Sequence, residues 1–440
     1  MIREPRKTRP LGPASDSIHQ FTNPSQISSY MRLLAAKKDT TVRAQNYYVE
    51  LFTDKLTSQL DFSYMNYSYQ PFSGYGGAIY LSSPGNVLLG STMADLMEDY
   101  KIDLGVKLNR SLINNEYVVR FRDLRHRLDK SLTLHRYVTD NYGMYYYRTF
   151  TNEAFYTLSY PFNETLSLRG TALYRWDRSI SLAIDNQSLA EGATSEHLGG
   201  LRAELVYDNS KKLQTNLYVG ARGKVFAEYY QTINRDTKNL FVVGFDYRNY
   251  TRIHRNFIWA NRIAGSSSFG QNKLIYFMGG VDNWILAKYD YETPIDYEQN
   301  YRYQTLATNM RGFKQNIRNG NNFIVFNSEL RFPVFSYLLD RPINLQFIKN
   351  FQIVAFGDVG TAWTGWNPYD PSNSLYTSHY HDGNLDISVT KMKEPIVGGF
   401  GFGLRTTLLG YFVRGDMAWG IEDGVINKKP QFYLSFNLDF

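Results

Sequence analysis

Residues 432–440 read Phe-Tyr-Leu-Ser-Phe-Asn-Leu-Asp-Phe, and this stretch decides the fold. Apolar side chains alternate with polar ones at every step, which places the two kinds on opposite faces of a β-strand. Its nine residues fall in the range of about 9–11 that a tilted membrane strand needs. We therefore expect one face to meet lipid and the other a polar lumen, as in a transmembrane β-barrel. The residues expected on the lipid face, which form a C-terminal strand signal, are Phe432, Leu434, Phe436, Leu438 and Phe440.

The same period-two pattern recurs along most of the chain. Ten strands are predicted from the middle of the sequence onward, near 166–175, 201–208, 216–224, 241–248, 256–265, 324–332, 352–363, 396–405, 411–419 and 432–440. The earlier part is less regular, with strands predicted near 56–69, 75–82, 86–95, 99–109, 116–128 and 152–161. The sequence thus predicts an all-β, antiparallel transmembrane barrel of about sixteen strands, an even number as in other single-chain bacterial barrels.

Composition supports the same class. The chain has 36 Tyr and 28 Phe, and aromatic residues make up 16% of it, which is typical of barrels with aromatic girdles at both membrane interfaces. An aromatic-rich soluble β-sandwich is the alternative.

The sequence contains no run of about 20 apolar residues, which a membrane-spanning helix would need. The net charge of +7 is spread along the chain without a basic run, so nucleic acid is not an expected partner.

The connections between strands alternate in length, as expected for short periplasmic turns and long outer loops. The exception is 333–350, which is long where a short turn is expected. The alternation predicts that both termini are periplasmic, in a bacterial outer membrane with its lipids and lipopolysaccharide as surroundings. Residues 1–45 are predicted to be a periplasmic linker or the tail of a missing domain, and residues 46–440 the barrel. Because residues 1–20 lack the apolar core of a secretory signal, we expect a fragment, a mature form or part of a longer precursor.

The longest connection, about 266–322, contains Asn309-Met310-Arg311-Gly312-Phe313. Here the chain resembles the BamA/TamA superfamily of outer-membrane assembly and translocation barrels. In that family a long sixth outer loop folds back into the lumen and carries a V/I-R-G-F/Y motif at its tip. Met310 departs mildly from the family pattern. The resemblance implies that Arg311, Gly312 and Phe313 hold the loop in the lumen.

The family places acidic partners for this arginine on the next two strands. Their counterparts here are Glu329 and Asp358, and alternation points both side chains inward. The resemblance extends from about 309 to the terminal Phe440. Its further strand motifs are carried by Phe356, Gly360, Gly401, Gly403 and Arg405.

Physical chemistry explains these residue types. Folding a long loop into a lumen costs chain entropy, which bidentate bonds from a guanidinium to carboxylates can offset. Gly312 allows close approach to the wall or a positive φ, and Phe313 supplies an apolar anchor. The alternative is that Arg311 is an ordinary solvated loop residue.

Enzymatic activity is not expected. The sequence has no Gly-x-Ser-x-Gly elbow and no His-Glu-x-x-His pair. His379 and His381 lie in a long outer loop, where a solvated pair is more common than a metal site. With no cysteines, disulfides and thiolate chemistry are excluded, and we expect neither a metal nor another cofactor.

The resemblance implies insertion or translocation of outer-membrane or secreted polypeptides through a weak seam between the first strand, near 56–66, and the last, 431–440. Its partners would be client polypeptides or periplasmic accessory proteins. The assembly members of the family carry periplasmic POTRA domains, and the roughly 45 residues before the barrel are too few for one. A pore or channel, and a structural anchor for a separate periplasmic domain, are therefore kept as alternatives.

Overall fold

The computed structural model divides the chain into a segment that ends at Val49 and a compact unit, Glu50–Phe440, that carries the sheet. The described residues are 32, 49–57, 69–72, 74, 87–108, 115–142, 146–182, 192–234, 237–339, 341–371, 373, 375–382, 385–390, 393–408, 410–436 and 439–440. Residues 1–45 therefore lie, except for Arg32, outside the described part. Their role as a linker or tail stays a prediction.

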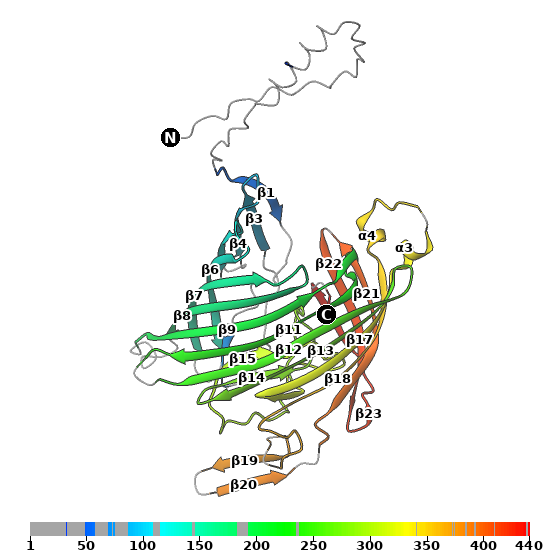
Figure 1. Ribbon diagram of the computed structural model, residues 1–440. Helices are drawn as coiled ribbons and strands as arrows, with labels where there is room; N and C mark the ends of the chain where they lie inside the picture. Colours follow the sequence, from blue (N-terminus) through cyan, green and yellow to red (C-terminus); the bar gives the residue numbers. More distant parts are fainter. Residues whose placement is uncertain are drawn as a thin grey trace. The chain divides into compact units, whose positions relative to one another are not determined.

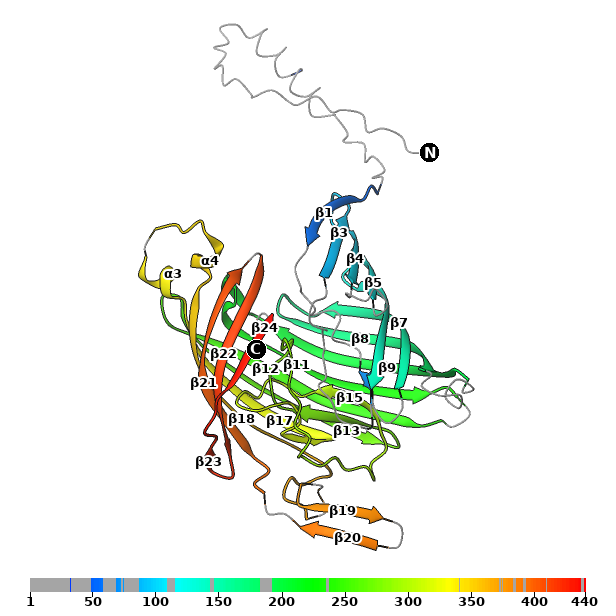
Figure 2. The ribbon, with the colours of Figure 1, turned by 180° about the vertical axis from the view of Figure 1, so that it is seen from behind.

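Eighteen strands of the unit belong to one antiparallel sheet (Figures 1 and 2). Two of them, β10 (Lys211–Gln214) and β23 (Val425–Ile426), are short and pair only with the strand next to them in sequence. The sixteen principal strands pair one after another in chain order as β1 (Phe52–Thr57), β3 (Val87–Ala94), β4 (Tyr100–Leu108), β5 (Glu116–Asp123), β6 (Asp129–Tyr142), β7 (Tyr146–Pro161), β8 (Leu166–Ser181), β9 (Thr194–Asp208), β11 (Leu217–Thr232), β12 (Asn239–His254), β13 (Phe257–Gly270), β17 (Asn322–Phe332), β18 (Gln352–Trp363), β21 (Val397–Leu408), β22 (Tyr411–Glu422) and β24 (Gln431–Phe436). The predicted fold class is confirmed, and the sixteen principal strands equal the predicted number, although not every one of them was predicted.

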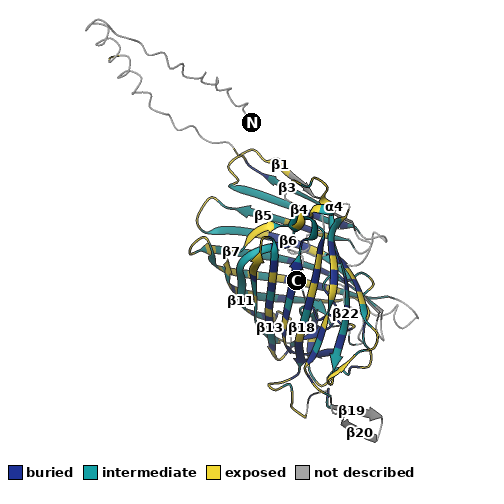
Figure 3. Cartoon of the chain, turned by 90° about the vertical axis from the view of Figure 1, so that its right-hand side faces the viewer, coloured by how far each residue is buried: buried dark blue, intermediate teal, exposed yellow. Residues whose placement is uncertain are grey.

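The polarity of this sheet is the reverse of that in a water-soluble domain. Large apolar side chains are exposed on its outer face, for example Leu201, Phe402 and Leu404, while charged residues such as Glu153 and Arg262 are buried on its inner face. Figure 3 shows buried and exposed positions alternating along single strands. Such a surface is stable only against hydrocarbon, so the sheet is the wall of a membrane barrel with a polar lumen.

The early strands differ in part from those predicted. The predicted series lacks β6, because Arg136 lies at an exposed position between outward Leu134 and Val138 and interrupts the apolar alternation. The prediction near 75–82 falls outside the described residues. The first strand was expected at 56–69, but β1 ends at Thr57, and 58–68 are not described.

Connections at one end of the barrel are short except for the one between β17 and β18, whereas those at the other end vary from three residues between β6 and β7 to fifty-one between β13 and β17. The unexpectedly long connection, 333–350, contains two small helices, α3 (Val334–Leu338) and α4 (Gln346–Lys349), at the short-turn end (Figure 1). At the opposite end, the hairpin of β19 (Thr377–Asp382) and β20 (Leu385–Thr390) belongs to the connection between β18 and β21. In the described part of the chain, no helix is long and apolar enough to cross a bilayer.

The outward face gives a direct test of membrane insertion. Leu201 is 62% exposed near the middle of β9. Leu201→Arg should lower the free energy of unfolding by about 2–4 kcal/mol, because a guanidinium at mid-membrane depth must leave water. Reversible denaturation in lipid vesicles measures this. Leu286→Arg, in a connecting loop and also exposed, is the control and should change stability by less than about 0.5 kcal/mol. Equal effects would contradict the membrane-facing assignment.

Candidate functional site in the lumen

Residues 271–321, between β13 and β17, form the sixth connection at the long-loop end. This segment contains β14 (Lys273–Met278), β15 (Tyr301–Leu306) and β16 (Arg318–Gly320). Together with β2 (Gln70–Pro71) they form a separate four-stranded sheet in the order β16-β14-β15-β2. Five of the six residues of β14 are buried, and Lys273 is partly exposed. The long sixth loop predicted to fold into the lumen is therefore present.

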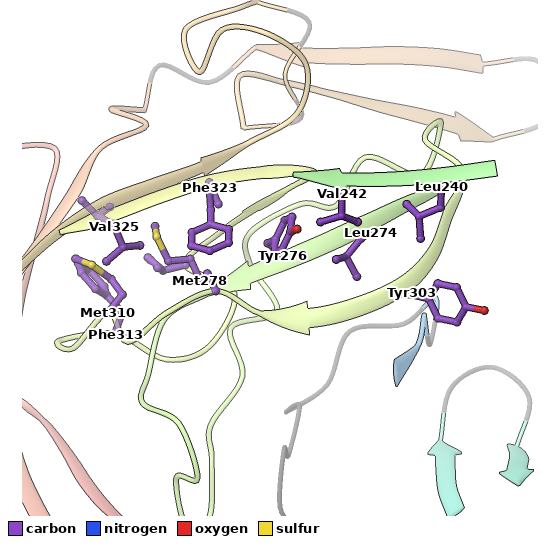
Figure 4. Packing of buried hydrophobic residues seen from close by; sticks show 14 of the residues in the cluster. Leu240, Val242, Leu274, Tyr276, Met278, Tyr303, Met310, Phe313, Phe323 and Val325 are labelled. Carbon is purple, nitrogen blue, oxygen red and sulfur yellow. The ribbon is translucent and has the colours of Figure 1, made fainter. Parts of the chain in front are cut away.

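Apolar side chains of the loop pack against the inner face of the wall. Figure 4 shows Tyr276 and Met278 of β14 beside Phe323 of β17, with Met310 and Phe313 of the loop tip at one end of the same cluster. Phe313 is 3% exposed and Met310 is fully buried. The predicted apolar anchor thus lies in a closed hydrophobic contact, which removes both tip residues from water.

Arg311 is held by carboxylates of two neighbouring wall strands. Its Nε and Nη2 donate to Asp358 Oδ2 and Oδ1 at 2.7 and 2.6 Å, and its Nη1 donates to Glu329 Oε1 at 2.6 Å. The backbone N–H of Arg311 also donates to Asp358 Oδ2, at 3.0 Å. Bidentate, charge-assisted bonds of this kind fix orientation as well as position.

The guanidinium of Arg311 has no exposed surface. Burial would lower the pKa of Arg311, but the charges of Asp358 and Glu329 outweigh burial and raise it above its usual value. The carbon centre of the guanidinium lies 3.7 Å from the centre of the Phe356 ring. Arg311 therefore stays charged, with carboxylates around its edge and an aromatic face beneath it.

Glu329 is shared among three arginines. Its Oε1 also accepts from Arg405 Nη2 at 2.6 Å, and its Oε2 accepts from Arg405 Nη1 at 2.9 Å and Arg331 Nε at 2.8 Å. Asn327 Nδ2 donates to Asp358 at 2.8 Å and to the Asn309 carbonyl at 2.8 Å, which ties the wall to the loop a second time. The resulting Arg311 network joins β17, β18, β21 and the loop tip.

Eight charged residues at and beside the Arg311 network are each at most 3% exposed, namely Arg311, Arg331, Arg405, Arg414, Glu329, Asp358, Asp416 and Asp439. The group continues through Asp439 to Arg222 and Arg248. Removing a single member leaves an opposite charge uncompensated, which costs far more than breaking an exposed pair.

Two glycines let the loop tip reach the wall. Gly312 has φ +102°, and a Cβ there would lie 2.6 Å from the backbone nitrogen of Gly420. A Cβ at Gly399 would lie 1.8 Å from the carbonyl oxygen of Arg311. The backbone of the tip therefore rests directly on β21 and β22, at positions where no side chain fits.

The other strand-motif residues lie close to this contact. Gly401 faces the Phe356 ring, and a Cβ at Gly403 would collide with Asp416 Oδ1. Gly360, higher on β18, packs against the backbone of β17, where a Cβ would lie 2.8 Å from the carbonyl of Ile324. The structure thus brings Phe356, Arg405 and both lumen glycines to the Arg311 network and leaves Gly360 beside it.

The last strand also contacts the loop tip. The Tyr433 hydroxyl donates to the Phe313 carbonyl at 2.8 Å and accepts from the Gly312 N–H at 2.8 Å. Phe432 and Leu434 are exposed at 66% and 47%, as predicted for lipid-facing residues. Leu438 lies outside the described residues.

The prediction that Phe440 faces lipid is wrong. Phe440 is 3% exposed and packs on Leu217, Tyr250 and Ile258 at the inner face. The preceding residue, Asp439, has φ +67° and accepts hydrogen bonds from Arg222, Arg248, Arg331 and the Tyr250 hydroxyl. The chain end therefore turns into the lumen, because the charge of Asp439 is neutralised there by three arginines.

Arg331, Arg414 and Asp416 were not predicted from the sequence as site residues. The available signal was that they lie on the same strands and the same face as Glu329 and Arg405. The alternation of 432–440 also places Asp439 on the lumen face, but it does not predict its partners, which lie on β11, β12 and β17.

No group of three or more His, Asp or Glu side chains that could hold a metal occurs among the described residues. His379 and His381 lie in β19, and their side chains are outside the described part. Where it is described, the site is a structural arrangement of ion pairs and packed rings.

Comparison with solved structures assigns this geometry to a known fold. The chain is similar to BamA from Haemophilus ducreyi lacking POTRA domains 1-3, with a TM-score of 0.52 and 13% sequence identity, over 92% of this chain and 77% of that chain. The chain has the BamA barrel fold. The fold expected from the Arg-Gly-Phe motif is thus confirmed.

CdiB from Acinetobacter baumannii is less similar to this BamA-type barrel, with a TM-score of 0.45 and 14% identity over 80% of this chain and 56% of that one. CdiB from Escherichia coli has a TM-score of 0.43 and 11% sequence identity, over 80% of this chain and 59% of that chain. No protein-family model matches the sequence, and no curated protein matches it.

Loss of Arg311 should loosen the loop. Arg311→Ala leaves Glu329 and Asp358 each short of a buried cationic partner, so the free energy of unfolding should fall by about 3–5 kcal/mol. Urea denaturation and the heat-induced gel shift of the folded barrel measure this. Lys314→Ala removes an exposed cation three residues further along the same loop and should have no measurable effect. A wild-type gel shift for Arg311→Ala would contradict the prediction.

Gly399→Ala tests the close approach without changing any charge. The added methyl group collides with the Arg311 carbonyl, so the tip should lift from the wall and become more sensitive to protease. Gly398→Ala is the matched control, because the nearest atom to its Cβ, on Ile421, is 3.7 Å away. If both variants resist digestion equally in a time course, the contact is not a determinant of loop position.

Proposed function

We propose that this chain is an outer-membrane barrel of the assembly and translocation superfamily, which inserts or translocates polypeptides through the seam between its first and last strands. Both termini would be periplasmic, and the barrel would lie among outer-membrane lipids and lipopolysaccharide. Its partners would be client polypeptides and periplasmic accessory proteins. The BamA fold and the Arg-Gly-Phe loop tip in the lumen support this proposal.

The observation that carries the proposal is the short pairing of the last strand. Over the described residues, β24 pairs with β22 through six residue pairs, and Asp439 and Phe440 beyond it are turned into the lumen, whereas β21 and β22 share eleven pairs. No pairing between β1 and β24 occurs among the described residues. A strand with few ladder bonds separates most easily and can offer its backbone to an incoming strand.

The long loop argues against a wide open pore. It fills part of the lumen with a packed sheet and leaves a polar cavity of about 640 Å³ beside Arg248, Asp246 and Asp439. A pore with this loop in place should conduct poorly. Single-channel conductance should therefore be small for the intact chain and rise several-fold when residues 283–306 are replaced by a short linker. A large conductance of the intact chain would favour the channel alternative.

A crosslink across the seam tests the proposal directly. Phe52 of β1 and Phe436 of β24 both lie toward the short-turn end of their strands, because Phe52 pairs with Ala94 and Phe436 with Val413, and the chain has no native cysteine. Phe52→Cys/Phe436→Cys joined by a flexible bis-maleimide should lower delivery of a client barrel into vesicles at least tenfold, because the seam can no longer open.

The matched control joins Leu132→Cys and Tyr156→Cys, which are exposed partners on β6 and β7. This crosslink should leave client insertion unchanged. Full activity of the seam-crosslinked protein would contradict a seam mechanism. No client insertion by the uncrosslinked protein would favour the pore or the anchor.

A further inference from the structure

The edge of β24 that does not face β22 is occupied by the long loop. Ser435 is bridged to Arg414 of β22 on one side and to Trp284 of the loop on the other. The Ile285 N–H donates to the Leu434 carbonyl at 2.8 Å, and Asn283 Nδ2 donates to the Phe436 carbonyl at 3.3 Å. Residues 283–285 thus add a short strand to the last strand of the barrel.

The side chain of Trp284 strengthens this attachment. It is 4% exposed, and its ring meets the Tyr433 ring edge-on with 4.7 Å between centroids. Val281, Phe356 and Ala418 complete the apolar cluster around it. The edge therefore has two elements of a strand-recognition site: backbone acceptors in register and an apolar pocket for one aromatic side chain.

We propose that the edge of β24 from Phe432 to Phe436 is a docking surface for an extended polypeptide strand that carries a large aromatic residue, and that residues 283–285 occupy it until such a strand displaces them. This inference rests on the proposed function and names the regulation of the same seam.

Two features favour a polypeptide strand as the occupant. The groups presented by the edge are the carbonyls of Leu434 and Phe436, which bind any backbone or amide N–H in register. Buried strand edges must also be paired, because an unsatisfied carbonyl away from water is costly. The loop segment satisfies the edge in the resting barrel, and a client strand satisfies it during exchange.

The loop tip is coupled to this edge through Tyr433. Its ring packs on Trp284, while its hydroxyl bonds to Gly312 and Phe313. Displacement of Trp284 therefore removes support from the residue that joins the last strand to the Arg311 network. Occupancy of the edge and position of the tip should change together.

A labelled peptide measures access to the edge. The probe is fluorescein-labelled Val-Asp-Asn-Trp-Ile-Leu-Ala, the sequence of residues 281–287, and its fluorescence anisotropy is followed with the intact 440-residue chain in detergent micelles. Wild type should bind it weakly, because its own segment competes. Trp284→Ala should bind at least tenfold more tightly.

Ile285→Pro provides a second variant that leaves Trp284 in place. Proline removes the N–H that donates to Leu434, so this variant should also bind the peptide more tightly than wild type. Ile285→Ala keeps the N–H and is the matched control, with binding like wild type. A scrambled peptide should bind none of the variants.

A disulfide closes the site reversibly. Trp284 and Ser435 form a non-hydrogen-bonded pair, in which Cα atoms lie about 4.5 Å apart, within disulfide range. Oxidised Trp284→Cys/Ser435→Cys should not bind the peptide, and reduction should restore binding. The control is Thr149→Cys/Ser179→Cys on β7 and β8, where the two hydroxyl oxygens lie 2.9 Å apart. Its oxidation should leave peptide binding unchanged.

The outcomes separate this inference from the proposed function. Equal peptide binding by wild type, Trp284→Ala and Ile285→Pro, or binding unaffected by oxidation, would overturn the docking surface. If the seam crosslink stops client insertion but wild type and the two loop variants bind the peptide equally, the proposed function stands and the regulation by residues 283–285 is rejected. If the loop variants bind the peptide more tightly than wild type but the protein inserts no client, the docking surface stands and the proposed function is rejected.

Discussion

The contact of Arg311 with Asp358 and Glu329 is the interaction on which the rest of the lumen depends. It attaches the loop tip to two adjacent wall strands through three charge-assisted bonds of 2.6–2.7 Å. The guanidinium is fully buried, so neither water nor salt can replace its partners. The glycines of β21 and β22 and the ring of Phe356 are arranged around this contact.

The reversed polarity of the wall makes this arrangement possible. A barrel in hydrocarbon must turn its apolar residues outward, which leaves its interior to polar and charged groups. Those groups are expensive to bury singly, so they pair with one another and with whatever enters the lumen. The long loop brings Arg311 into this environment, and the chain end brings Asp439. Both segments are held in the lumen by opposite charges supplied by the wall.

The last strand connects the loop to the proposed seam. Tyr433 contacts the Arg-Gly-Phe tip, and the far edge of the strand is covered by residues around Trp284. Its ladder to β22 is short, and its end curls away from the wall toward the arginines. In the proposed mechanism, a client strand would compete with the loop for the backbone groups on this far edge, while β24 stays paired with β22 on its other edge.

The sequence by itself determined the barrel, most of its strands, the long sixth loop and the inward direction of Glu329 and Asp358. These properties are local or periodic: alternation assigns each residue to a face, and the loop length follows from where the alternation stops. Only the tertiary structure decided the position of Phe440 and the cover on β24. The alternation of 432–440 predicts an outward Phe440, but the three arginines that draw Asp439 inward lie on strands more than a hundred residues away. Likewise, Trp284 meets Ser435 only because the barrel brings loop and chain end together, a long-range contact that no local pattern encodes.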